Sequence, residues 1–364
     1  MKAAIRLARA VSLLILTIAT ACDNVNWGGA DFTVVPPPPK ATTQSGTDEE
    51  PTTRAEETLP EGPIVYYVAR SAEGGIMVPV GEVSGDSLRP LRARRDPRLF
   101  SERFIAEHMR QGAEFVLFKN GVRVGTLVIQ TASAEVADAC GPTPRAIGTL
   151  ELSTGAESIT EFLALSQLHA PMVPRRADQS LEATRTMTFV APILAERMLR
   201  RRGAQLPGSW TGAMEQVKAF PVSTGQDPGF SATFLVGDLL GSGLDNEGYS
   251  LFFLAVPSAA QVGWDTVLVS FHDYPRDGKA APRVIDFLDW DRDDHVELLQ
   301  QVYGINDSWF EAVGRGQSNV WRRILRDRCE GSSAAPTDSL TPRPTGSRIP
   351  TPLTARPDSV PTAR

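Results

Sequence analysis

The second half of the chain holds seven apolar segments of strand length that follow one another closely. They are rich in β-branched and aromatic residues and are separated by turn-forming residues. Parallel strands need a crossover of a dozen or more residues, usually a helix, and helical crossovers do not fit these gaps. The sequence therefore predicts antiparallel meanders, built from residues 231–236, 249–256, 265–272, 283–287, 296–303, 309–313 and 320–325.

The first half mixes strand and helix signals. A strand is expected at 64–68, and Asn120-Gly121 between two apolar runs predicts a hairpin with a type I′ turn. Three helices are expected. The first spans 101–110, the second begins near Ser158, where Ser158 and Glu161 have capping-box spacing, and the third spans 192–203. The fold class predicted for the whole is α+β and β-rich, with antiparallel meanders or small sheets and about three helices.

Composition divides the chain into a body and two flanking segments. Residues 22–62 form a linker with a proline run at 36–39 and acidic residues at 48–50, typical of an extended tether. Residues 331–364 are rich in Pro, Ser and Thr and lack aromatic residues, which predicts a disordered tail. The body is expected to divide near residue 205, into an α+β subdomain at 63–205 and a β-rich one at 206–330.

The first 21 residues have the pattern of a signal peptide. Lys2, Arg6 and Arg9 precede an apolar run that is too short to span a bilayer. Small residues at 19–21 then stand before Cys22, and this arrangement resembles a bacterial lipoprotein signal. The resemblance implies lipidation of Cys22 and a membrane-anchored, extracytoplasmic protein, on the periplasmic side of the inner or outer membrane or at the cell surface. The same small residues also fit ordinary A-x-A cleavage.

The other two cysteines have two interpretations. If Cys22 carries a lipid, Cys140 and Cys329 form an even pair in a compartment that permits disulfides. They are either bridged or two buried free thiols.

The stretch 289–297 carries the most specific chemical pattern. Its carboxylates repel one another unless a cation lies among them, and calcium takes six to eight oxygen ligands. The candidate metal ligands are the side chains of Asp289, Asp291, Asp293 and Glu297 and the carbonyl of His295. A solvated acidic turn without metal, or another metal, remains open.

This pattern resembles the DxDGDGxxD/E calcium loop of the FG-GAP and VCBS repeats of integrin-type β-propellers and bacterial extracellular proteins. Arg292 and Asp294 stand where those repeats usually have glycine. A degenerate copy lies upstream around Asp238, where Leu240 and Ser242 replace two carboxylates, so a structural turn is expected there. Two repeats cannot close a propeller, and a small sheet or sandwich is implied instead, with Ca²⁺ as a structural ion.

Composition and motifs leave few clues to function. A net charge of -6 and a pI near 5.4 argue against nucleic-acid binding, and no HExxH, GxSxG, P-loop or CxxC pair is present. The sequence favours a binding, adhesion or structural module acting on an unidentified envelope protein or polymer. The alternative is a metal-dependent hydrolase built from His272, Asp273, Asp286, Asp289 and His295.

One cationic cluster also has two readings. Four arginines at 197 and 200–202 end the expected third helix. They either contact anionic lipid or polymer, or complement the negative end of the helix dipole.

Overall fold

The computed structural model describes residues 58–92, 96–138, 141–173, 181–222, 227–241, 247–260, 262–316 and 320–328, with only the backbone at 135–138, 141 and 181–184. Residue contacts divide the chain into two units, Met1–Arg54 and Ala55–Arg364. All described residues belong to the second unit. The expected signal peptide, lipidation at Cys22, Cys140–Cys329 pairing and tail lie outside the described residues, as does the expected linker up to residue 57. The last residues of that linker are described, and Leu59 packs against a hydrophobic core.

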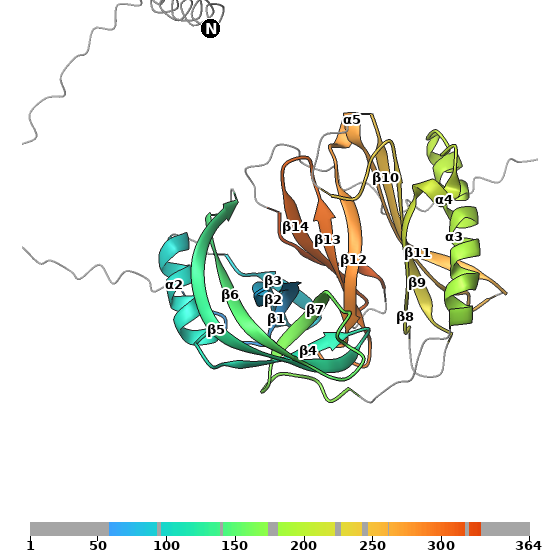
Figure 1. Ribbon diagram of the computed structural model, residues 1–364. Coiled ribbons are helices and arrows are strands. Elements are labelled where there is room, and N and C mark those ends of the chain that lie inside the picture. The colour runs from blue at the N-terminus through green and yellow to red at the C-terminus, as the bar shows by residue number, and fades with distance from the viewer. Residues whose placement is uncertain are drawn as a thin grey trace, which may run out of the picture. The chain divides into compact units, whose positions relative to one another are not determined.

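The first seven strands form a closed barrel with one added strand. The ring order is β1-β7-β4-β5-β6-β2, and pairing of β1 with β2 closes it (Figure 1). β3 pairs with the end of β2 that extends beyond its pairing with β6. Every pairing is antiparallel. The strands are β1 (Ile64–Ser71), β2 (Gly74–Ser84), β3 (Ser87–Pro90), β4 (Glu114–Lys119), β5 (Val122–Asp138), β6 (Gly141–Leu152) and β7 (Glu161–Ser166).

Two local features shape this barrel. Asn120 and Gly121 have φ values of 50° and 71° between β4 and β5, which confirms the left-handed hairpin turn. Gly75 of β2 pairs with Gly148 of β6, and a Cβ on Gly148 would lie 2.5 Å from the Val128 carbonyl oxygen. A Cβ on Gly75 would lie 2.6 Å from Leu127 Cδ1 and one on Gly148 2.8 Å from Leu127 Cδ2, so the two glycines leave room for the Leu127 side chain of β5.

The helix expected from Ser158 is wrong, because this segment forms strand β7. Phe162 and Ala164 point into the barrel core, whereas Leu163 and Leu165 pack in a second core outside it. The apolar run is continuous because both faces of β7 are buried, so it lacks the alternation that marks a half-buried strand.

Helix α2 (Pro97–His108) covers part of the barrel core with Phe100 and Phe104. It begins earlier than the expected 101–110. The Asp96 side chain caps it by accepting hydrogen bonds from the N–H groups of Arg98 (3.1 Å) and Leu99 (3.0 Å).

The second half forms two four-stranded antiparallel meanders, as the sequence predicts. The described chain is β-rich and is not a propeller. One sheet contains β8 (Met214–Phe220), β9 (Gly229–Val236), β10 (Tyr249–Pro257) and β11 (Trp264–Asp273). The other contains β12 (Ala281–Leu288), β13 (Glu297–Tyr303), β14 (Ser308–Gly314) and β15 (Arg322–Arg326).

Helix α3 (Leu181–Arg202) is longer than the expected 192–203 and holds Pro192 inside it. Its buried residues, including Ala191 and Leu199, pack against Phe230 and Phe253 of the β8–β11 sheet. The boundary expected near residue 205 assigns this helix to the first half, but its packing joins it to the second. Two one-turn helices, α4 (Trp210–Ala213) and α5 (Tyr274–Asp277), complete the described helices.

Shared cores join these parts in layers. The outer face of the barrel packs on the β12–β15 sheet, the other face of that sheet packs on the β8–β11 sheet, and α3 covers the far face of the latter (Figure 1). No helix in the described part of the chain is long and apolar enough to cross a membrane.

Candidate metal centre

The acidic loop is the turn of the β12–β13 hairpin. Leu288 pairs with Glu297, so the intervening residues form the connection. Arg292 and Asp294 have φ values of 66° and 67°, the left-handed conformation that glycine supplies in the repeats this loop resembles. Asp adopts this conformation more readily than most residues, so the loop shape is kept without glycine.

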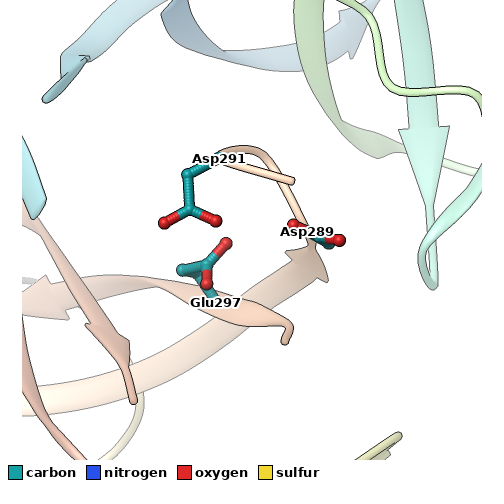
Figure 2. A group of neighbouring side chains, drawn as sticks. All are labelled: Asp289, Asp291 and Glu297. Atoms are coloured by element: carbon teal, nitrogen blue, oxygen red, sulfur yellow. The ribbon is translucent and has the colours of Figure 1, made fainter. Parts of the chain in front are cut away.

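Three carboxylates converge within this loop. Ligand oxygens of Asp289, Asp291 and Glu297 all lie within 4.8 Å of one another, and Figure 2 shows Asp291 and Glu297 facing each other beside Asp289. Two oxygens bound to the same calcium ion can be at most about 5 Å apart, since each lies about 2.3–2.6 Å from it. The spacing therefore fits a shared hard cation.

The structure brings together three of the four expected side-chain ligands, and the fifth expected ligand, the His295 carbonyl, is not a side-chain group. The Asp293 carboxylate instead accepts a hydrogen bond from the His295 N–H (2.8 Å). The Asp293 N–H donates to Asp289 Oδ1 (3.1 Å) and Asp291 Oδ1 (3.2 Å). The His295 ring contacts Arg315 through Nδ1 (2.8 Å). Asp293 thus shapes the loop around the other two aspartates.

Burial makes these carboxylates costly to ionise. Glu297 is only 2% exposed, and burial, followed by the nearby Asp291 charge, raises the pKa of its carboxyl to about 10. Burial and Asp293 raise the pKa of Asp291 to about 6, and burial also raises the pKa of Asp289. The backbone N–H of Trp290 donates to Glu297 (3.1 Å). The nearby Arg315 charge acts on Glu297 and Asp293, so described side chains offset part of the negative charge of the site, and a bound cation would fit the rest.

The upstream loop is neutralised differently. The Lys279 ammonium lies 2.7 Å from Asp238, and both side chains are buried. The Tyr274 hydroxyl donates to the same carboxylate (2.9 Å). An ammonium therefore supplies the positive charge there. Sequence reasoning missed Lys279, because it lies 41 residues from Asp238 and carries no local signal.

The residues of the alternative hydrolase site are not gathered in one place. His272 contacts Ser270 (3.2 Å), and burial, followed by the Arg323 charge, lowers its pKa to about 4. In the part of the chain with described placement, the one group of three or more potential metal ligands is Asp289, Asp291 and Glu297. His272, Asp273 and Asp286 are outside it.

Asp286 belongs to a buried charge cluster where three sheets meet. Its carboxylate is fully buried and accepts hydrogen bonds from the N–H of Asn120 in the β4–β5 turn (2.9 Å) and from Lys218 of β8 (3.0 Å). Lys119 of β4 lies 3.8 Å away. Hence Asp286 links the barrel and both meanders and has no open position for a substrate.

Comparison with family models, with curated proteins and with solved structures finds no match to this chain, and the resemblance to calcium-loop repeats rests on the loop residues alone.

Proposed function

We propose that this chain is a calcium-stabilised structural or binding module, held by a lipid at the extracytoplasmic side of a bacterial membrane. The observation that carries the calcium assignment is the convergence of Asp289, Asp291 and buried Glu297 within 4.8 Å. Removing their mutual repulsion requires either protonation or a cation. A hard divalent ion with oxygen ligands matches the chemistry of the three groups.

The surroundings of the loop give calcium a structural role. Arg292 donates hydrogen bonds to the carbonyls of His169 (3.1 Å) and Ala170 (3.4 Å), just after β7 of the barrel. Trp290 packs in the core between the barrel and the β12–β15 sheet. Arg315, which contacts His295, also donates to the Val222 carbonyl that follows β8. An ion that fixes this loop would therefore fix contacts to both neighbouring layers.

Calcium should raise the melting temperature of the purified protein, and a chelator should lower it. Binding to the native state alone contributes about 2.7 kcal/mol at a hundredfold excess over Kd, which corresponds to a shift of several degrees in a protein of this size. Magnesium should have a smaller effect because it requires tighter octahedral geometry. Thermal unfolding followed by circular dichroism measures the shift.

Two variants locate this response. Asp289→Asn combined with Asp291→Asn should abolish the calcium shift, since it removes two of the three converging charges. Asp294→Asn is the matched control, because Asp294 lies in the same loop outside the group and asparagine also tolerates its left-handed backbone. Superimposed melting curves of the unmodified protein in calcium and in chelator would show that the loop is an acidic turn without metal.

The membrane part of the proposal is carried by the residues before Cys22 and is tested separately. Mass spectrometry of the protein extracted from its native membrane should find Cys22 as an N-terminus carrying two or three acyl chains. A mature protein beginning at an unmodified residue would exclude the anchor and leave the calcium proposal intact.

A further inference from the structure

The face of α3 that points away from the β8–β11 sheet carries two large exposed apolar residues. Phe189 is 77% exposed and Ile193 is 60% exposed. They are four residues apart, so their side chains lie on the same side of the helix. Figure 1 shows α3 as the outer layer over β8–β11, and the opposite side of the helix is buried against that sheet.

Arginines flank this apolar pair along the same face. Arg185 lies one turn before Phe189 and Arg197 one turn after Ile193, and Arg200 and Arg201 follow; all four are exposed. Glu196 is the one acidic residue between 185 and 202 and pairs with Arg200 (2.6 Å). A protein of net charge -6 thus carries a locally cationic, apolar-centred helix face.

The helix dipole does not account for this pattern. Cations near a helix C-terminus are favourable, which explains Arg200 and Arg201. Arg185, however, is the fifth residue of α3, close to the end where the dipole disfavours a cation, and the dipole gives no reason for exposed Phe189 and Ile193. Arg202 has a different role, since it stacks on the Phe271 ring at 5.5 Å.

We propose that this face of α3, comprising Arg185, Phe189, Ile193, Arg197, Arg200 and Arg201, binds the surface of an anionic lipid bilayer. Apolar side chains that enter the headgroup boundary and basic residues attracted to anionic lipids both contribute to the binding of a helix at a membrane surface. The arginines would meet lipid phosphates while Phe189 and Ile193 enter between headgroups. The helix would lie in the plane of the surface with the β8–β11 sheet above it. This inference depends on neither the metal nor the acylation at Cys22.

The test uses the chain from residue 22 onward with Cys22→Ser, so that neither a lipid nor the signal peptide contributes. Sedimentation is measured with vesicles of phosphatidylglycerol and phosphatidylethanolamine, and with vesicles of phosphatidylcholine. Binding should occur on the anionic vesicles and weaken as salt is added, because salt screens exposed charges.

Two double variants should weaken binding to the anionic vesicles, the first at least about tenfold because each arginine near such a surface contributes about a factor of five, and the second because it removes the apolar area that would leave water. They are Arg197→Glu with Arg201→Glu, and Phe189→Ser with Ile193→Ser. The matched controls are Arg89→Glu with Arg123→Glu on exposed barrel positions, and Leu168→Ser with Met172→Ser, whose side chains are also exposed. Melting curves establish that each variant is folded.

Unchanged binding in the α3 variants, or equal binding to neutral and anionic vesicles, would overturn the proposal. Retention on an immobilised acidic protein or polysaccharide without vesicle binding would also overturn it, because the partner would then be a polymer and not a bilayer.

Discussion

Replacing Asp286 by alanine should lower the free energy of unfolding by about 3–5 kcal/mol, the usual cost of removing one partner from a buried ion pair. Asp286 is fully buried, and Lys218 lies 3.0 Å and Lys119 3.8 Å from it. Without the carboxylate, Lys218 must lose its proton or remain charged in a poorly solvated site, since burial already lowers its pKa. The N–H groups of Asn120 and Phe287 also lose their acceptor.

Urea unfolding of the purified protein measures this loss. Adding Lys218→Met to Asp286→Ala should restore part of the free energy of unfolding, because it removes one uncompensated ammonium. A surface ion pair should show no such large loss and recovery. The exposed pair of Arg98 and Glu102 on α2 (3.0 Å) provides that control, and Arg98→Ala should cost no more than about 0.5 kcal/mol. Equal effects of Asp286→Ala and Arg98→Ala would contradict the role of Asp286 as a link between the sheets.

Glu297→Gln should make the protein more stable in chelator at pH 8 and abolish its response to calcium. Burial, the main cause, raises the pKa of Glu297 from 4.5 to about 10 in the folded state. An acid whose folded pKa is raised contributes its stability below the unfolded pKa and loses it as pH rises toward the folded pKa. In chelator, the free energy of unfolding should therefore decrease between about pH 5 and pH 10, by at most about 1.4 kcal/mol per pH unit.

Glutamine has the shape of glutamate and no charge, so the variant should lack this part of the pH dependence. Asp291, whose pKa is raised to about 6, keeps titrating in both proteins at lower pH. Arg315 faces the same site, and burial lowers the pKa of its guanidinium. In calcium the order should reverse, with the unmodified protein more stable than Glu297→Gln. Parallel pH profiles of the two proteins in chelator would exclude Glu297 as a buried, proton-binding group.

Local signals predicted most of the second half and little of how the first half closes. The meanders and the Asn120-Gly121 turn follow from short stretches of sequence, because consecutive antiparallel strands and tight turns are encoded by neighbouring residues. The barrel depends on β1 pairing with β7, as in Tyr66 with Ala164. A pairing over such a separation leaves no mark in either segment, and β7 itself was expected to be a helix.

The candidate site was also predicted only where local sequence determines it. Spacing within the loop identified Asp289, Asp291 and Glu297, since their convergence needs only one tight hairpin. It also included Asp293, because a pattern of alternating carboxylates does not show which of them turns back to accept the His295 N–H. Lys279 beside Asp238 and Lys218 beside Asp286 could not be predicted, because the partners lie 41 and 68 residues apart in the sequence.

The position of β7 sets an order on the folding of the barrel. β7 is the last of the barrel strands in sequence, yet it lies between β1 and β4. Until residues 161–166 have left the ribosome or crossed a membrane, the other strands can form only an open sheet in which β1 and β4 expose unpaired backbone N–H and carbonyl groups. Such edges are templates for association with other chains. These two edges stay unpaired until β7, which ends 47 residues after β4 (166 against 119), whereas each meander strand can pair as soon as it follows its neighbour.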